Sequence, residues 1–370
     1  MKPTFKFVLL ALIVCAAAVN LSAQAPGPDS ACTPKFPFLD QWLGADVGSS
    51  VRLPDGRDFW IFGDTLYGKK RVVTGNDPKM VRNSIGMSTC KNGEFKIHYT
   101  IRRKDKKEAD FFTPRLPNTW YWALNGAYYK GDIWVTLLCV KTAPSESAAL
   151  GFKGCGADLA HITGISNPDP QKWKIEYLEL VPDGPESYPT AVAVFEKEYL
   201  YIFSVNDFGE HSQVVTRVPV SKLNEPKKNL EYLATDGQWK PGFDPKNAKA
   251  VMAKGSSEFT IRFHPELKKW IAVMFEPGWM SSKVIVRSAD ELLGPWTDGK
   301  EIYNTPEMQK DSKGYDPDTF CYAAKEHTEF EKPGELVFTY VCNTMKPPKL
   351  PDLMNIYFPQ VVRMKMPELK

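Results

Sequence analysis

The sequence lacks an excess of charge of either sign. Its 370 residues include 47 Lys and Arg against 44 Asp and Glu, which gives a formal net charge of +3. Two of the basic residues, Lys2 and Lys6, lie in the extreme N-terminus. Such an even balance of charge creates no electrostatic field that would attract nucleic acid or an anionic membrane. It is suited instead to a partner that is itself uncharged.

The sequence also lacks several motifs that carry chemistry. It has no G-x-S-x-G, no P-loop and no G-x-G-x-x-G, which argues against serine hydrolases, phosphoryl transfer and dinucleotide binding. The S-x-D-x-G-x-T-W box of sialidase propellers is missing as well. There is no C-x-x-C, and the five histidines form no H-x-x-x-H pair. We therefore expect no cofactor and no catalytic metal.

Long hydrophobic runs are missing beyond the N-terminus. Residues 1–25 have the pattern of a secretory signal, with a basic start, an apolar stretch at Phe7–Val19 and a small-x-small cleavage site at Ala23-Gln24-Ala25. The apolar stretch is shorter than the ~20 residues that a membrane-spanning helix needs. We expect an exported protein, periplasmic or extracellular, that consists of residues 26–370 after cleavage.

Six of the seven cysteines follow the expected signal. An even number in an oxidising compartment permits three disulfides, although six cysteines can pair in 15 ways. We favour Cys139–Cys155 and Cys321–Cys342, because each pair flanks a predicted hairpin or neighbouring strands. Buried free thiols are the alternative.

The chain does contain an internal repeat. Five strand-like segments of similar aromatic and aliphatic character recur along it. Their marker residues are Trp60, Trp134, Tyr201, Trp270 and Val337. Successive markers are 74, 67, 69 and 67 residues apart, and the 345 residues after position 25 amount to 69 for each of five units.

Each marker segment follows an earlier strand-like segment across a turn, as at Pro54-Asp55-Gly56 and Lys130-Gly131-Asp132, which is the pattern of a β-hairpin. The spacing leaves room for two more strands in each unit. The sequence therefore predicts an all-β fold, a five-bladed β-propeller with four-stranded antiparallel blades that forms a single domain over residues 26–370. A tandem of β-sandwiches is the alternative.

Acidic residues occupy particular positions of this repeat. In a propeller blade, the start of the first strand and the end of the second lie at the same mouth of the central channel. Asp46 and Asp64 have these positions in the first unit, and Glu258 begins the fourth. Glycoside hydrolysis needs one carboxylic acid to protonate the leaving oxygen and a second carboxylate as base or nucleophile, and crowding raises the pKa of one of them. We expect Asp46 and Asp64 to be the catalytic pair with Glu258 third; capping of strand ends is the alternative.

Other residues near these strand ends are candidates for substrate binding, either as polar partners of sugar hydroxyls or as aromatic faces for sugar rings. They are Arg82, Asn83, Trp122, Asn125, Trp279, Asp318 and His327. A surface salt bridge is the alternative role for Arg82, and core packing is the alternative for the aromatic residues.

These motifs resemble a family of secreted bacterial five-bladed propellers long catalogued as a domain of unknown function. The segments that carry the resemblance span most of the expected mature chain. They are Gly44-Ala45-Asp46, Leu53-Pro54-Asp55-Gly56-Arg57, Trp60-Ile61-Phe62-Gly63-Asp64-Thr65, Arg82-Asn83-Ser84, Ser257-Glu258-Phe259, Gly294-Pro295-Trp296 and Tyr322-Ala323-Ala324-Lys325-Glu326-His327. Members of that family resemble arabinanase-type glycoside hydrolases, and some are endo-D-arabinanases. The resemblance implies that Asp46 and Asp64 are catalytic.

Together, the repeat and the resemblance predict an exported glycoside hydrolase that cleaves a furanosidic, arabinan-like polysaccharide, D-arabinan included. A carbohydrate-binding propeller without catalytic activity is the main alternative. A scaffold for protein partners is a third and would require an exposed apolar patch.

Overall fold

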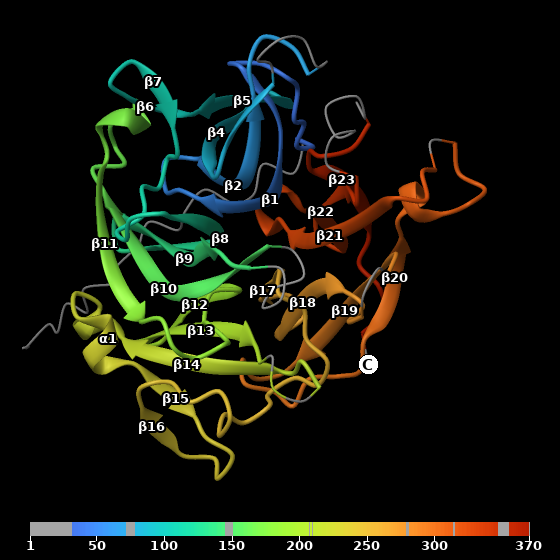
Figure 1. Cartoon of the computed structure of the whole chain (residues 1–370). Coiled ribbons are helices and arrows are strands. Elements are labelled where there is room, and N and C mark those ends of the chain that lie inside the picture. The colour runs from blue at the N-terminus through green and yellow to red at the C-terminus, as the bar shows by residue number, and fades with distance from the viewer. Residues whose placement is uncertain are drawn as a thin grey trace, which may run out of the picture.

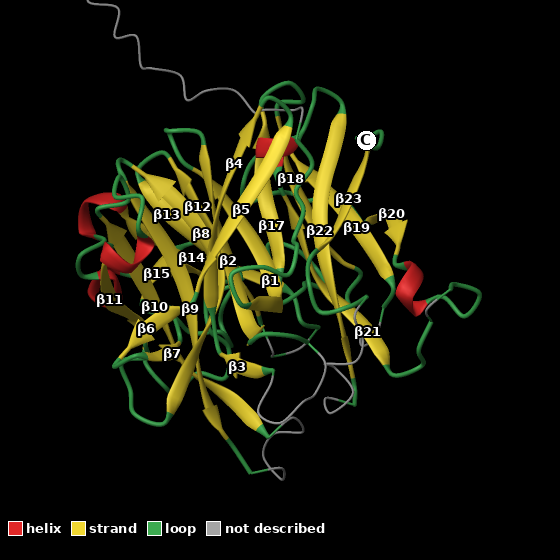
Figure 2. Ribbon diagram, turned by 90° about the horizontal axis from the view of Figure 1, so that it is seen from above, coloured by secondary structure: helices red, strands yellow, loops and turns green. Residues whose placement is uncertain are grey.

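A computed structural model describes residues 32–71, 78–144, 151–206, 208, 210–278, 281–313, 315–346 and 355–369. The expected signal segment and Trp279 lie outside these residues. Antiparallel sheets follow one another along the chain and form a ring (Figure 1). In the view of Figure 2, the strands of the blades run side by side through the molecule, and the helical segments are short.

The ring is closed by contacts between the innermost strands of the five sheets. These strands are β1 (Trp42–Arg52), β8 (Thr119–Tyr129), β12 (Val192–Glu196), β17 (Phe259–His264) and β21 (Thr319–Glu326). β1 contacts β8 and β21, β12 contacts β8 and β17, and β17 contacts β21. A tandem of sandwiches has no such ring, so the prediction of a five-bladed propeller is confirmed.

The first two blades have the four strands that the repeat predicts. Blade 1 pairs β1 with β2 (Arg57–Tyr67), β4 (Ser84–Lys91) and β5 (Glu94–Thr100), and the short β3 (Lys79–Val81) pairs with the end of β2; blade 2 pairs β8 with β9 (Asp132–Thr142), β10 (Phe152–Thr163) and β11 (Lys174–Val181). Between them lies a small hairpin of β6 (Arg102–Lys104) and β7 (Lys107–Ala109).

The later blades vary in strand number. Blade 3 has β12, β13 (Tyr199–Val205), β14 (Gln213–Pro219), β15 (Glu231–Leu233) and β16 (Trp239–Pro241); blade 4 has β17, β18 (Lys269–Phe275), β19 (Lys283–Ala289) and β20 (Lys300–Asn304); blade 5 has β21, β22 (Glu335–Thr344) and β23 (Gln360–Lys365). Within the described residues, blade 3 therefore has five strands and blade 5 has three. The two outermost strands of blade 3, β15 and β16, are three-residue pieces, so the fifth strand adds little length to the blade.

Helical segments occur only as single turns in the described chain. They are η1 (Pro170–Lys172), η2 (Val220–Lys222), α1 (Pro226–Asn229), η3 (Pro306–Met308) and η4 (Thr328–Phe330). None of the helices in the described residues is long and apolar enough to cross a membrane.

The predicted hairpins form because their turns supply the backbone angles that tight reversals need. Gly56 closes the β1–β2 turn at φ 83°, and its N–H bonds the carbonyl of Leu53 at 3.0 Å. Lys130 and Gly131 both have positive φ, 48° and 103°, in the turn between β8 and β9. Two-residue hairpin turns with positive φ at both positions match the twist of the flanking strands.

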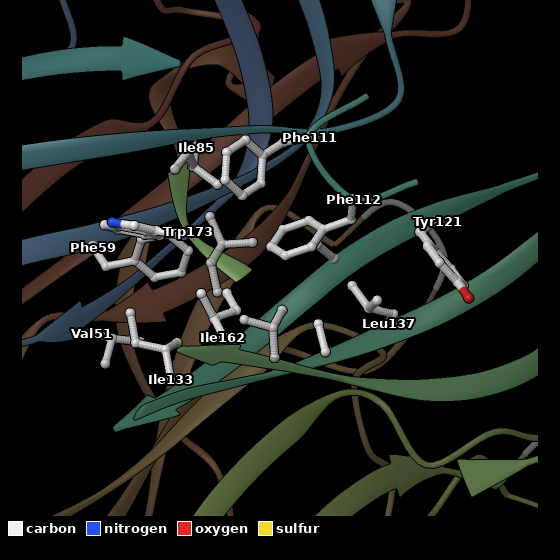
Figure 3. Close-up of a cluster of buried hydrophobic side chains, with 14 of the residues drawn as sticks. Val51, Phe59, Ile85, Phe111, Phe112, Tyr121, Ile133, Leu137, Ile162 and Trp173 are labelled. Carbon is white, nitrogen blue, oxygen red and sulfur yellow. The ribbon is translucent and has the colours of Figure 1, made fainter. Parts of the chain in front are cut away.

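Apolar side chains fill the spaces between neighbouring blades. Figure 3 shows the cluster between blades 1 and 2, where Phe59 of β2 lies near Trp173 and Phe111 near Ile85. The rings of Phe59 and Trp173 are 5.8 Å apart, and Phe59 is fully buried. Burial of each such side chain stabilises the fold by about 1.5–3 kcal/mol.

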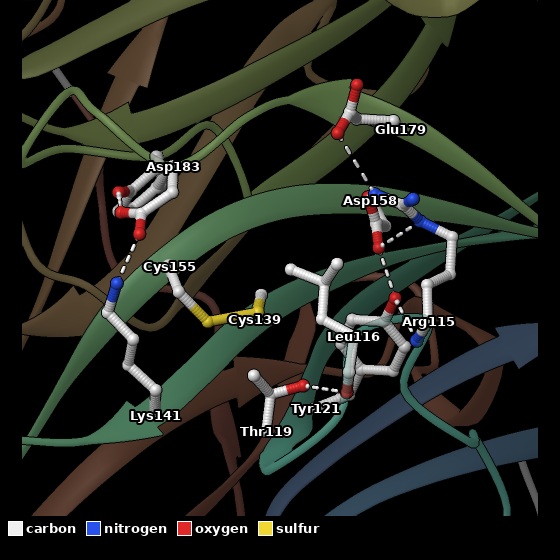
Figure 4. Close-up of a disulfide and its surroundings, with 11 residues drawn as sticks. Arg115, Leu116, Thr119, Tyr121, Cys139, Lys141, Cys155, Asp158, Glu179 and Asp183 are labelled. Atoms are coloured by element: carbon white, nitrogen blue, oxygen red, sulfur yellow. Dashed lines mark hydrogen bonds and ion pairs between the residues drawn. A yellow bond between two sulfur atoms is a disulfide. The ribbon is translucent and has the colours of Figure 1, made fainter.

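Three disulfides form, Cys32–Cys90, Cys139–Cys155 and Cys321–Cys342. The last two are the pairs that the sequence favours. Cys139 and Cys155 join β9 to β10, and Cys321 lies directly opposite Cys342 on β21 and β22. Figure 4 shows the Cys139–Cys155 disulfide near the Asp158 carboxylate, which accepts two hydrogen bonds from Arg115 at 3.0 Å each.

The Cys32–Cys90 disulfide helps to hold the segment that begins at Cys32 where blades 1 and 5 meet. Cys32 is bonded to Cys90 of β4 in blade 1. Arg363 of β23 in blade 5 donates to the Cys32 carbonyl at 2.7 Å and to the Phe330 carbonyl at 2.9 Å. One short segment thereby ties the first blade to the last.

Removal of the Cys32–Cys90 disulfide by double substitution with Ser should destabilise the protein. The bond closes a loop with a sequence separation of 58, which corresponds to about 4 kcal/mol of chain entropy in the unfolded state. Denaturant unfolding without reductant measures the loss. The Cys139→Ser/Cys155→Ser variant, whose disulfide has a separation of 16, should lose less stability, about 3 kcal/mol. Unchanged stability of the Cys32→Ser/Cys90→Ser variant would contradict the stabilising role of the Cys32–Cys90 disulfide.

Candidate active site

Irregular pairing between β1 and β2 places Asp46 next to Asp64. The register passes from Ala45 opposite Thr65 to Val47 opposite Phe62, so Asp46 faces a stretch with one residue more on the β2 side. Bulges of this kind redirect side chains and are common beside active sites. Val47, a β-branched residue, has φ 68°, a conformation that such residues rarely adopt.

Gly63 makes room for the Asp46 carboxyl group. A Cβ atom built on Gly63 would lie 2.2 Å from Oδ1 of Asp46 and 2.9 Å from a methyl carbon of Val47. Any side chain at this position would displace the carboxyl group. The Phe-Gly-Asp sequence at the end of the second strand is therefore a packing requirement of the pair of acids.

Asp46 of blade 1 accepts a side-chain hydrogen bond from the neighbouring blade 5. The hydroxyl of Tyr322 on β21 donates to Oδ2 of Asp46 at 2.8 Å, and the Tyr322 oxygen accepts from Nδ2 of Asn343 at 3.4 Å. Burial, followed by the charges of Asp64 and Glu258, raises the pKa of Asp46 well above its usual range; the bonds from Tyr322 and the Asp64 backbone oppose that shift.

Asp64 has cationic and polar donors instead. Nη1 of Arg82 donates to Oδ2 at 3.1 Å, and the indole Nε1 of Trp122 donates to Oδ1 at 3.2 Å. Burial raises the pKa of Asp64, and the charge of Arg82 and the hydrogen bond from Trp122 partly offset this rise. The cation Arg82 thus favours the ionised form of Asp64, whereas the charges of Asp64 and Glu258 favour the protonated form of Asp46.

Glu258 acts on this pair from blade 4. It immediately precedes β17, and its charge raises the pKa values of Asp46 and Tyr322. Its buried Oε2 has no hydrogen-bond partner. Burial raises the pKa of Glu258, and the charge of Lys325 on β21 opposes this rise. Lys325 is fully buried, donates to the carbonyls of Leu124 and Phe259, and has its pKa lowered by burial to about 8.

The site also has an aromatic wall. Trp122 packs edge-on against Phe152 at 4.9 Å, and the guanidinium of Arg82 lies 4.6 Å from the ring centre of Trp120. Both tryptophans remain partly exposed. An ion pair beside half-exposed aromatic rings offers polar contacts and a flat apolar surface together.

The structure thus groups Asp46, Asp64, Arg82 and Trp122, with Glu258 in their electrostatic environment, and places three other predicted site residues in the protein interior. Asn83 bonds the Phe112 backbone through both ends of its amide. Asn125 donates to Ser49 and accepts from the Ala193 N–H, which links three blades. Both are fully buried.

His327 is likewise fully buried. Its Nδ1 lies 2.5 Å from the hydroxyl oxygen of Ser50, its Nε2 lies 2.8 Å from that of Thr339, and its ring packs against Trp60. Asp318 precedes β21 and forms an ion pair with Lys346 at 2.6 Å.

Tyr322, Tyr357 and Lys325 are parts of the site that strand-end positions alone do not reveal. The Tyr357 hydroxyl donates to the main-chain carbonyl of Asp64 at 3.0 Å. Tyr322 and Lys325 flank a register shift in β21, where Ala323 has φ 56°. The Tyr322–His327 segment carries the family resemblance, which is the available signal. Tyr322 lies in the part of β21 that bonds Asp46, whereas His327 follows the last residue of β21, at the end opposite to the acids.

Two places in the described chain bring three potential metal ligands together. In the first, Glu307 lies beside Cys321 and Cys342, whose sulfurs are joined in a disulfide and offer no thiolate. The second, of His264, Glu326 and Glu331, lies by the opposite ends of the innermost strands. A cavity of about 770 Å³ occupies that end and is lined in part by Arg52, Tyr128, Phe195 and His264.

Comparison with known proteins identifies the family. Residues 36–363 match the family described as Domain of unknown function (DUF5005), and the chain belongs to it. The resemblance seen in the sequence motifs is confirmed at this level. None of the curated proteins matches the chain.

Several solved structures align with most of this chain. A candidate hydrolase from Bacteroides ovatus superposes with a TM-score of 0.69 at 17% identity, over 87% of this chain and 85% of that one. An exo-1,5-α-L-arabinanase from a bovine ruminal metagenomic library gives a TM-score of 0.47 at 12% identity, over 90% and 95%. A GH43 endo-arabinanase from Bacillus licheniformis gives 0.45 at 13%, over 88% and 94%. At such identities, the first of these likenesses establishes a common fold.

Substitution Tyr322→Phe should raise the pKa of Asp46 still further. The lost hydroxyl donates to Asp46 and favours its ionised form. Carboxyl carbon NMR titration of Asp-labelled protein measures the shift. Tyr357→Phe is the matched control, because that hydroxyl bonds a main-chain carbonyl and should affect Asp46 less. A pKa of Asp46 that stays constant or falls in the first variant would refute the assigned bond.

Proposed function

We propose that the protein is an exported glycoside hydrolase that cleaves a furanosidic, arabinan-like polysaccharide. One observation carries this proposal: two carboxyl groups lie side by side at the bulged pairing of β1 with β2, in surroundings that separate their proton affinities. Because a single fold hosts many activities, the proposal depends on these residues and not on the propeller.

The unequal surroundings assign the two roles. Asp46 keeps its proton, because burial and the charges of Asp64 and Glu258 disfavour its ionised form. It would give that proton to the glycosidic oxygen as the bond to the anomeric carbon breaks. Asp64, held ionised by Arg82 and Trp122, would accept a proton from the attacking water or attack the anomeric carbon itself. Glu258 maintains the raised pKa of Asp46.

Contacts around the pair suit a neutral sugar polymer. Trp120 and Trp122 provide partly exposed rings, and Arg82 is 42% exposed in its side chain while it binds Asp64. The nearly balanced net charge of +3 offers no attraction for a polyanion. The arabinan-like class, D-arabinan included, comes from the family resemblance.

Export is part of the proposal. Three disulfides in the described chain are typical of proteins that mature in an oxidising compartment. The pattern of residues 1–25 would supply the secretion signal and leave residues 26–370 as one catalytic propeller.

Substitution of either acid by Asn should abolish hydrolysis while leaving the fold intact. We expect Asp46→Asn and Asp64→Asn to lose roughly 10²–10⁴-fold in rate, the usual contribution of a general acid or base. Release of reducing ends from plant L-arabinan, mycobacterial D-arabinan and fungal furanosides measures the activity. Asp290→Asn, at an exposed pair with Lys269, is the matched control.

Two outcomes would count against this function. Full activity in both variants would remove the acids from the mechanism. Saturable glycan binding with no product from the unsubstituted protein, on any substrate of the panel, would favour a carbohydrate-binding propeller without catalysis.

The pH profile should respond to Arg82. Its charge lowers the pKa of Asp64, so Arg82→Gln should raise that pKa. Because Asp64 must be ionised, activity is lost as pH falls through its pKa, and the acidic limb of kcat/KM should move to higher pH. Arg103→Gln, which alters an exposed pair with Glu108, should leave the limb in place. An acidic limb that shifts to lower pH in Arg82→Gln would reverse the assignment of Asp64.

A further inference from the structure

Three buried ligand-type side chains meet at the end of the innermost strands opposite to the candidate active site. His264 ends β17, Glu326 ends β21, and Glu331 follows η4. One possible ligand atom from each lies within 4.8 Å of the other two. The exposed fractions are 3%, 0% and 7%, so the group is almost completely removed from bulk water.

The hydrogen bonds of this cluster leave one acceptor unused. Nε2 of His264 lies 2.8 Å from Oε1 of Glu326, but the buried Oε2 of Glu326 has no partner. An unpaired buried carboxylate oxygen costs more than the bond that it forgoes. A buried carboxylate oxygen without a partner, in a group of three converging side chains, is suited to bind a cation.

Outer contacts hold the ligands in place. Nδ1 of His264 lies 3.1 Å from Oε1 of Glu266, which leaves Nε2 to face Glu326. Oε1 of Glu331 accepts the Val337 N–H at 2.9 Å. A carboxylate behind a histidine and a bond to a ligating carboxylate are the supports that metal sites commonly have.

Carboxylates outnumber basic side chains around the cluster. Besides Glu326 and Glu331, the carboxylates of Glu266 and Glu329 lie close by, and Arg52, Arg262 and Lys332 line the adjoining cavity. One dication would neutralise both ligating carboxylates and leave His264 uncharged.

We propose that a zinc ion binds between His264, Glu326 and Glu331 and fastens blade 4 to blade 5. One imidazole with two carboxylates suits zinc, whereas calcium takes oxygen ligands alone. The cavity of about 770 Å³ that His264 and Glu331 line gives the ion a path of entry and room for a water as fourth ligand. The site lies apart from Asp46 and Asp64, so zinc binding there is independent of the proposed hydrolysis.

Calorimetric titration of tag-free protein, stripped with EDTA and dialysed, with zinc chloride tests the proposal. We expect one zinc per chain with micromolar or tighter affinity, a higher melting temperature with zinc, and no comparable effect of calcium chloride. Glu331→Gln should weaken binding at least tenfold, since the amide still accepts the Val337 N–H but carries no charge.

Two controls make the outcome decisive. Glu329→Gln changes a buried glutamate of the same segment that lies outside the group of three and bonds Ser50, and it should bind zinc nearly as the unsubstituted protein does. Asp46→Asn should bind zinc normally whether or not it is active. Anomalous diffraction at the zinc edge should give a peak between the three ligands. No peak there, unaltered binding by Glu331→Gln, or preference for calcium would each overturn the proposal.

Discussion

The bulged pairing of β1 with β2 is the constraint on which the site depends, because it holds two carboxyl groups together with little access to water. Gly63 has no side chain, so the Asp46 carboxyl group lies against the strand that carries Asp64. Burial and mutual repulsion then keep a proton on one acid. Tyr322, Arg82 and Trp122, from three different parts of the ring, divide the pair into a proton holder and an ionised partner.

Much of this arrangement follows from sequence periodicity. A step of about 69 residues predicts five blades, and the position of Asp46 and Asp64 in one hairpin predicts that they meet. Periodicity assumes regular pairing, however, and the register shift at Ala323 breaks that assumption. Tyr322, beside this shift, bonds Asp46, while His327 follows the opposite end of β21 and is buried. The fifth strand of blade 3 is not predicted, because three-residue strands such as β15 have no recognisable sequence pattern.

Contacts between blades are the other part of the structure that the sequence cannot predict. His264 of blade 4 and Glu326 and Glu331 of blade 5 form no local motif, because they come together only when these neighbouring blades pack. Lys325 reaches the carbonyls of Leu124 and Phe259 for the same reason. The two ends of the innermost strands thus have different chemistry: one carries the paired aspartates, and the other carries the buried cluster and the large cavity.

The central claim is that substrate binds at the aspartate end of the propeller and not in the cavity at the opposite end. A crystal structure of the Asp64→Asn variant with a furanosidic oligosaccharide, chosen as the best substrate of the activity panel, tests this most directly. We predict a sugar chain across Trp122 and Arg82, with a glycosidic oxygen within hydrogen-bond distance of Asp46. An oligosaccharide seated instead beside Arg52 and His264 would contradict the account.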